Sequence, residues 1–202
     1  MPKNTSKGTT AEQRHKVARE AATLLYSRLE KEYRQAKLKA AENLGVHVLP
    51  SNLEVALELD QIAEEREGEA RRQRLFEMRK DALAIMKVLK RFCPLLIGSV
   101  WRGTSRRGSD IDIETYSDKP QQALGVLKAN DVEILRSEQV TVTEHGQIVA
   151  SLHIYAKSQH GHEVEIVVRG TSAKGQKRLC DTYGDQIKGF TTMDLEKLLN
   201  IH

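Results

Sequence analysis

Two aspartates separated by one residue form the pattern in this chain that most directly indicates chemistry. Asp110 and Asp112 alternate with Ile111 and Ile113. Because successive side chains of a β-strand point to opposite faces, this spacing puts both carboxylates on one face and both isoleucines on the other. Neighbouring carboxylates repel each other unless a cation lies between them, and hard oxygen ligands suit Mg²⁺ or Mn²⁺. The pair therefore predicts a divalent-metal site, the alternative being a solvated strand face.

A glycine-serine step precedes the aspartates and follows a short apolar run, residues 95–97. Gly98 can adopt backbone conformations closed to other residues, and its lack of a side chain lets a phosphate approach the chain. If a helix begins at this point, the free backbone N–H groups of its first turn face an anion. Arg102 lies one helical turn beyond Ser99, where its guanidinium can pair with a phosphate. The segment therefore predicts a phosphate site beside the metal site.

Together these motifs resemble the signature of the DNA polymerase beta nucleotidyltransferase superfamily. In that superfamily a hydrophobic strand, a Gly-Ser turn, a short helix and an Asp-x-Asp strand hold a metal-bound nucleoside triphosphate. The residues that carry the resemblance are Gly98-Ser99, Arg102-Gly103 and Ser109-Asp110-Ile111-Asp112. The resemblance implies that the chain transfers a nucleoside monophosphate from a nucleoside triphosphate to a hydroxyl acceptor, with Mg²⁺ or Mn²⁺ as the cofactor.

Sites of this kind normally use a third carboxylate, from a strand beside the Asp-x-Asp strand. Glu163 and Glu165 alternate with apolar residues over residues 163–168, so both acids share one face. The archaeal CCA-adding enzymes, a branch of the same superfamily, carry a run of the type Val-Glu-Val-Asp-Val-Val here, and aligning the chain on it implies that Glu165 is the third metal ligand. The usual residue is aspartate, and glutamate moves the carboxylate out by about 1.5 Å. A displacement on the order of 1 Å can lower a rate ~10²-fold, so this departure bears on activity. The alternative for both glutamates is a solvated strand face.

The resemblance also implies a role for each site residue. Asp110, Asp112 and Glu165 would hold the metal that activates the attacking hydroxyl, and the two aspartates would also bind the metal on the triphosphate. Gly98 and Ser99 would cradle the β and γ phosphates, and Arg102 would pair with a phosphate. The basic loop of residues 170–178 is expected beside this site.

The sequence predicts helices almost throughout residues 1–92, the region that precedes these motifs. Thr10 and Gln13 form a capping box before an apolar stripe that continues to Gly45. Ser51 and Glu54 form a second capping box. The expected helices are residues 10–45, residues 51–68 with an end or a kink at Gly68, and residues 69–92.

From residue 95 onward, short apolar runs with period-two alternation indicate strands. The expected strands are residues 95–97, 110–113, 132–135, 140–142, 152–155 and 163–168, the last two joined as a hairpin. The sequence thus predicts an α+β protein. Residues 1–92 are expected to form a helical N-terminal region, and residues 93–202 a nucleotidyltransferase catalytic domain with a mixed sheet of about five strands and flanking helices.

Composition sets the outer limits on function. No apolar run approaches the ~18 residues that a membrane-spanning helix needs, and the first thirty residues lack a signal-peptide core. Cys93 and Cys180 are typical of reduced thiols rather than of a disulfide framework. We therefore expect a cytoplasmic protein with no membrane partner.

Charge distribution bears on the acceptor. The net charge is +4, and residues 1–92 hold 19 Lys and Arg against 14 Asp and Glu, with Arg71, Arg72 and Arg74 as the densest basic cluster. This cluster is either a solvated face or a contact with nucleic acid. The expected acceptor is the 3′ end of an RNA such as tRNA, then a partner protein's side chain, as in antitoxin-type minimal nucleotidyltransferases, and then a small molecule such as an aminoglycoside. The alternative function is a catalytically weak nucleotidyltransferase fold that acts as a nucleotide sensor or a nucleic-acid-binding module.

Overall fold

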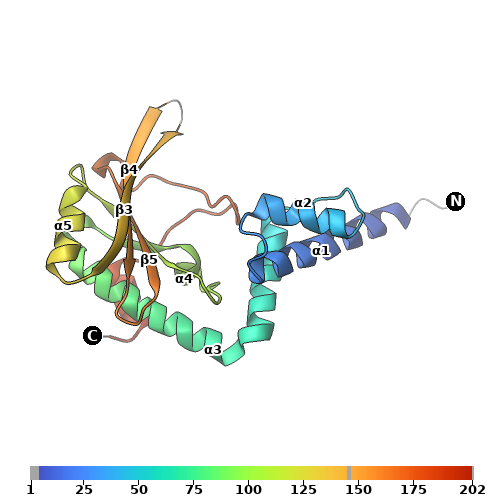
Figure 1. Ribbon diagram of the computed structural model, residues 1–202, viewed down its shortest axis with the longest axis horizontal. Coiled ribbons are helices and arrows are strands. Elements are labelled where there is room, and N and C mark those ends of the chain that lie inside the picture. Colours follow the sequence, from blue (N-terminus) through green and yellow to red (C-terminus); the bar gives the residue numbers. More distant parts are fainter. Residues whose placement is uncertain (1–4, 145–146, 202) are drawn as a thin grey trace. The chain divides into compact units, whose positions relative to one another are not determined.

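Two compact units make up the computed structural model, which describes residues 5–144 and 147–201 (Figure 1). The first unit contains residues 5–68 and Arg178–Gln186. The second contains Glu69–Lys177 and residues 187–201. No helix among the described residues is long and apolar enough to cross a membrane.

The first unit is helical, with a core built largely from alanine and small aliphatic side chains. Its helices are α1 (Thr5–Tyr26), α2 (Tyr33–Asn43) and the part of α3 (Asn52–Val88) that precedes Gly68. Gly68 has φ 48° and ψ −125°, so α3 kinks at that residue, as the sequence predicted. The predicted capping box is confirmed: the Ser51 N–H donates to Glu54 Oε2 over 2.6 Å, and the Glu54 N–H donates to Ser51 Oγ over 3.1 Å. The buried residues include Val17, Ala21, Leu25, Ala36, Ala40, Val55 and Ile62.

The prediction of one helix over residues 10–45 is wrong. Helix α1 ends at Tyr26, where the N–H of Leu29 donates to the Leu24 carbonyl over 3.0 Å, and α2 begins at Tyr33. Thr10 and Gln13 lie inside α1, so they form no N-terminal cap. The apolar stripes of α1 and α2 are buried in the same core, and a chain reversal lets the two stripes pack together. This tertiary packing outweighs the local preference for a continuous helix.

The second unit is built on a five-stranded mixed sheet with the order β1-β2-β5-β4-β3. Strands β2 and β5 are parallel, and the other neighbours are antiparallel. The strands are β1 (Leu95–Ile97), β2 (Ile111–Tyr116), β3 (Glu133–Glu144), β4 (Gln147–Lys157) and β5 (Glu163–Arg169). The helices are α4 (Gly98–Arg102), α5 (Gln121–Ala129) and α6 (Thr192–Leu198), with the 3₁₀ turns η1 (Lys90–Phe92) and η2 (Thr171–Ala173). The predicted α+β class is therefore confirmed.

Several strands and helices of the second unit also differ from the predicted ones. Residues 132–135 and 140–142 were expected as separate strands, but they belong to one long strand, β3, with a register shift between Ile134 and Arg136. Helix α5 was not predicted. The third predicted helix ends at Val88, and the 3₁₀ turn η1 follows it.

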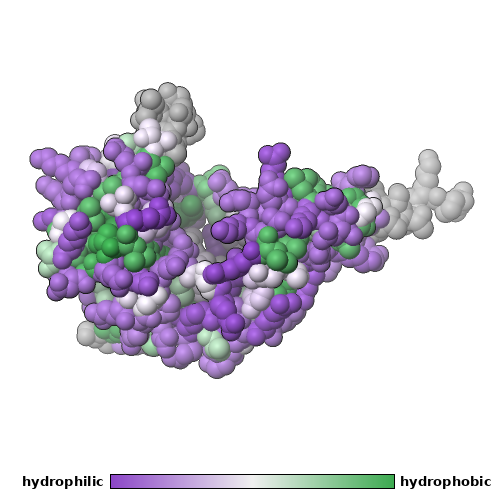
Figure 2. All heavy atoms as spheres, in the orientation of Figure 1, coloured by the Kyte–Doolittle hydropathy of each residue, from purple (hydrophilic) through white to green (hydrophobic). Residues whose placement is uncertain are grey.

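One face of the sheet is packed and the other carries polar side chains. The packed face presents residues of β2, β4 and β5, covered by the second half of α3 and by α5. Its fully buried members include Ile111, Ile113, Ile154, Val164, Ile166, Met78, Met86, Leu89 and Leu127. Because side chains alternate along a strand, the carboxylates of the Asp-x-Asp pair lie on the opposite face. On the side of the molecule drawn in Figure 2, hydrophilic side chains predominate and divide the apolar area into patches.

Candidate active site

Strand pairing aligns Asp112 with the two segments that the sequence singled out. Across the β1–β2 ladder Asp112 pairs with Ile97, the residue before Gly98. Across the β2–β5 ladder it pairs with Glu165. The expectation that a strand with a third carboxylate lies beside the Asp-x-Asp strand is confirmed.

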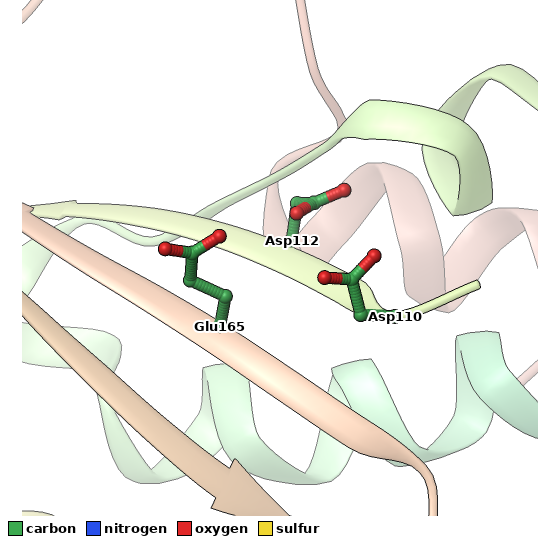
Figure 3. Close-up of side chains that lie close together, drawn as sticks. All are labelled: Asp110, Asp112 and Glu165. Carbon is green, nitrogen blue, oxygen red and sulfur yellow. The ribbon is translucent and has the colours of Figure 1, made fainter. Parts of the chain in front are cut away.

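Asp110, Asp112 and Glu165 form a cluster, called here the carboxylate cluster. Each offers an oxygen, and these oxygens all lie within 4.8 Å of one another. Figure 3 shows the three side chains on the same side of β2 and β5. Asp110, just before β2, is exposed, whereas Asp112 and Glu165 are half-buried. Within residues 5–144 and 147–201 this is the one group of three or more such side chains that could hold a metal ion, and Glu163 is not part of it.

Mutual repulsion and burial make the cluster unfavourable when all its members are charged. Burial, and after it the negative charges of Asp110 and Glu165, together raise the pKa of Asp112 to about 8. The pKa of Asp110 is also raised, first by loss of solvent and then by the charges of Glu165 and Glu163. A divalent cation between the carboxylates would reverse both effects, because it stabilises the charged forms. The residues present therefore fit a hard divalent cation such as Mg²⁺ or Mn²⁺.

Gly98 lies directly against this cluster. Its φ of 69° lies in the left-handed region, and a Cβ atom built on it would lie 1.8 Å from Oδ2 of Asp112. No other residue fits at this position, for both conformational and steric reasons. Ser99 follows at the start of α4 and is half-buried. The glycine predicted to let a phosphate approach thus also lets the Asp112 carboxylate reach the turn.

Arg102 lies at the end of α4, with its guanidinium 4.8 Å from the centre of the Trp101 ring. Trp101 in turn meets Phe190 edge to face, with the ring centres 6.5 Å apart. The tryptophan therefore packs within the protein. Arg79 donates to the carbonyls of Val100 and Trp101 over 3.1 and 3.3 Å, and so holds the C-terminal end of α4.

The basic cluster of residues 71–74 is not uniformly solvated. Arg71 is buried and donates from Nε to the Ser105 carbonyl over 2.8 Å. Arg72 is exposed and pairs with Glu69 at 2.8 Å. For Arg71 both predicted alternatives, a solvated face and a nucleic-acid contact, are wrong. It fixes the segment between α4 and β2 that leads to Asp110.

The loop of residues 170–178 does not lie beside the carboxylate cluster, contrary to expectation. The N–H and hydroxyl of Thr171 donate to Asp118 over 2.8 and 2.6 Å. Lys174 Nζ lies 3.1 Å from Cys93 Sγ. Asp118 follows the last residue of β2, whereas Asp110 precedes its first. The loop is therefore attached to the opposite end of that strand.

Sequence reasoning missed the side chains that surround Glu165 from strand β4. His153 Nδ1 lies 2.7 Å from Glu165 Oε1, and Ser151 Oγ lies 3.1 Å from His153 Nε2. Tyr155 pairs with Glu165 across the ladder. The tyrosine's pKa is raised to about 12 by burial and by its hydrogen bonds to Glu138 and Glu165. The period-two spacing of residues 151, 153 and 155 was a signal that they share a face, but it did not reveal which strand lies beside them.

Comparison with known proteins gives matches in solved structures alone. No protein-family model and no curated protein matches the chain. Similar solved chains include Cid1 with its short product ApU, at 17% identity over 48% of this chain and 31% of that chain, with a TM-score of 0.33. Cid1 with the UTP analog UMPNPP matches at 15% identity over 56% and 36%, with a TM-score of 0.34. A cytoplasmic RNA terminal U-transferase matches at 16% identity over 58% and 34%, with a TM-score of 0.30.

The chain spans about a third of the length of these solved chains. At such identities and TM-scores, the function must be argued from the residues of the chain itself.

Proposed function

We propose that this protein is a metal-dependent nucleotidyltransferase of the DNA polymerase beta superfamily, which transfers a nucleoside monophosphate from a nucleoside triphosphate to a hydroxyl. The observation that carries the proposal is the convergence of three carboxylates from two parallel strands, with Gly98 against one of them. The Gly-Ser turn and the Asp-x-Asp strand are adjacent both in the sequence motif and in space. Asp112 is half-buried and its pKa is raised, which favours a functional site over a solvated strand face.

Asp110, Asp112 and Glu165 would hold Mg²⁺ or Mn²⁺ in this reaction. Bound divalent ions supply charge stabilisation for the attacking and leaving oxygens of an in-line displacement. The acceptor oxygen forms a bond to the α-phosphorus, the bond from that phosphorus to the bridging oxygen breaks, and pyrophosphate leaves. The acceptor's proton passes to solvent or to a carboxylate of the site. Gly98 and Ser99 would orient the β and γ phosphates, and Arg102 would pair with a phosphate.

Among acceptors, we propose an RNA 3′ end, such as that of a tRNA. A side chain of a partner protein is the second choice. Both offer the hydroxyl that the carboxylate cluster would activate. The polar face of the sheet around the cluster is open to solvent at Asp110, so the cluster is accessible to a macromolecular acceptor.

Transfer of label tests the proposal directly. Purified protein is incubated with each α-labelled nucleoside triphosphate, Mg²⁺ and total RNA or cell extract, and the label is then separated into RNA, protein and free nucleotide. We expect label in RNA, and none with Glu165→Ala. Glu165→Ala should keep Mg·nucleotide affinity within a few-fold, because Asp110 and Asp112 remain, and should raise the barrier by several kcal/mol.

The matched control is Glu163→Ala, which removes the neighbouring acid on the same face and should leave transfer unchanged. Label in protein instead of RNA would change the acceptor but keep the reaction. If no acceptor is labelled while nucleotide still binds, the protein is a nucleotide sensor and the proposed enzyme function is wrong.

A further inference from the structure

Glu165, the third member of the carboxylate cluster, is contacted by side chains of strand β4. Strands β4 and β5 are antiparallel, and Tyr155 lies directly across from Glu165. His153 lies two residues before Tyr155, on the same face of β4. Its Nδ1 is 2.7 Å from Glu165 Oε1, and both side chains are largely buried, with 20% and 25% of their surfaces exposed. This hydrogen bond is short and shielded, so it restricts the carboxylate strongly.

We propose that His153 is a positioning residue for Glu165, through which strand β4 sets where the third carboxylate meets a divalent cation. The inference deepens the proposed function and rests on it, since it concerns the same metal site. Among the described residues, Glu165 is the one member of the carboxylate cluster that is hydrogen-bonded to an imidazole.

Ser151 contacts the other ring nitrogen of His153. The Ser151 hydroxyl lies 3.1 Å from Nε2. If this hydroxyl donates to Nε2, then Nδ1 carries the proton and donates to Glu165, so each polar group has a complementary partner. The chain of hydrogen bonds runs from Ser151 through the ring to the carboxylate. Such outer partners fix the orientation of a metal ligand and tune its affinity.

The direction of the ring argues for positioning rather than for proton abstraction. With Nδ1 protonated, Nε2 accepts from Ser151 on the side of the ring away from Glu165. Neither ring nitrogen is then left to accept a proton from a hydroxyl at the cluster. His153 therefore acts through Glu165 and does not contact the attacking oxygen.

The same contact accounts for the glutamate where the family usually has aspartate. An aspartate at position 165 would withdraw the carboxylate by one C–C bond, about 1.5 Å. From a starting distance of 2.7 Å, the hydrogen bond to His153 would then be lost. The longer side chain and the histidine are thus matched. Because a carboxylate has about four lone-pair directions, the bonds from His153 and Tyr155 still leave directions for a cation.

Binding of Mn²⁺ alone, followed by electron paramagnetic resonance, tests this inference without relying on catalysis. His153→Leu removes the donor, whereas His153→Asn keeps an N–H near the position of Nδ1. We expect His153→Leu to weaken Mn²⁺ binding about 10–100-fold and His153→Asn to stay within a few-fold of the parent. In a Glu165→Ala background, His153→Leu should have no further effect, because the histidine acts only through that carboxylate. Thermal melts of each variant show that it is folded.

The outcomes distinguish the positioning role of His153 from the existence of the metal site. Equal Mn²⁺ affinity for the parent and His153→Leu would overturn the positioning role and leave the metal site standing. Equal losses in the presence and absence of Glu165 would also overturn it, because a general structural effect would then be responsible. If the parent chain binds no Mn²⁺, with or without a non-hydrolysable nucleoside triphosphate, the proposed function fails and the positioning role fails with it.

Discussion

The two faces of the sheet in the second unit are built from the same strands, yet they differ in almost every physical property. On the packed face, Ile111, Ile113, Val164 and Ile166 are covered by helices and exclude water. On the polar face, the residues that alternate with them are Asp110, Asp112 and Glu165, which repel one another, and the pKa values of the two aspartates are raised. Adjacent residues of one strand therefore have opposite effects: a side chain on the packed face stabilises the fold, and its neighbour on the polar face does not.

This difference indicates where stability and function reside. The packed face supplies the burial that holds the strands in register, and the register in turn brings the carboxylates together. The repulsion on the polar face should lower stability in the absence of a cation, as the proposed metal site implies. Substitutions on the two faces should therefore have opposite effects on stability.

The largest effect is expected on the packed face. Ile166 is fully buried, so Ile166→Ala should lower the free energy of unfolding by about 2–5 kcal/mol. Its neighbour on the polar face provides the comparison: Glu165→Gln should leave that free energy unchanged or raise it, because it relieves repulsion. Urea unfolding of the two variants measures both. Comparable losses would mean that the two faces do not divide stability and function as described.

A smaller effect is expected at the contact between the turn and the cluster. Gly98→Ala would place a methyl group against Asp112 in a left-handed conformation, which costs roughly 1–2 kcal/mol before any displacement of the carboxylate. Mg·nucleotide affinity should fall with it. The control is Gly125→Ala, inside α5, where a Cβ has open space, and where alanine should stabilise by roughly 0.5–1 kcal/mol. An unchanged nucleotide affinity in Gly98→Ala would show that the turn tolerates a side chain.

The pH dependence of stability should show the cost of ionising Asp112 on the polar face. Asp112 ionises near pH 8 in the folded chain but near pH 4 when unfolded, so the folded state holds the extra proton between these values. The contribution of Asp112 to stability should therefore fall as pH rises from about 4 to about 8, and level off above that. Melting temperatures in EDTA should show this decline, and Asp112→Asn should flatten it. Added Mg²⁺ should raise the melting temperature more at the upper end of the range than at the lower end. A parallel decline in Asp112→Asn would assign the effect to other groups.

The smallest effect is expected at Arg72, whose guanidinium pairs with Glu69. Arg72→Gln should leave both stability and the salt dependence of RNA binding unchanged. A log–log salt slope that becomes flatter by ~0.7 would instead indicate a phosphate contact with single-stranded RNA. Arg71→Gln provides the contrast, because losing its buried bond to the Ser105 carbonyl should lower the melting temperature.

Local patterns predicted the parts of the fold that depend on near neighbours in the sequence. The alternation around Asp112 and Glu165 gave the correct faces, and the Gly-Ser turn, the capping box at Ser51 and the kink at Gly68 were found in the same way. Local patterns could not predict the break between α1 and α2, because this break depends on the packing of two alanine-rich stripes against each other.

Contacts between residues far apart in the sequence could not be predicted from local patterns either. His153 and Glu165 meet because β4 pairs with β5 in one register, and the buried Arg71 donates to a carbonyl 34 residues away. A charge cluster in the sequence does not show which of its members is turned inward. The roles proposed for the site residues thus rest on their assembled geometry together with the motif.

The most direct test of the central claim is calorimetric titration of nucleoside triphosphate with and without Mg²⁺, on the parent chain and on the double variant Asp110→Asn, Asp112→Asn. The account predicts Mg²⁺-dependent binding by the parent, no such binding by the double variant, and a melting temperature without ligand that is maintained or raised in the variant. Undiminished Mg·nucleotide affinity in the folded double variant would contradict the claim that these carboxylates hold a metal-bound triphosphate.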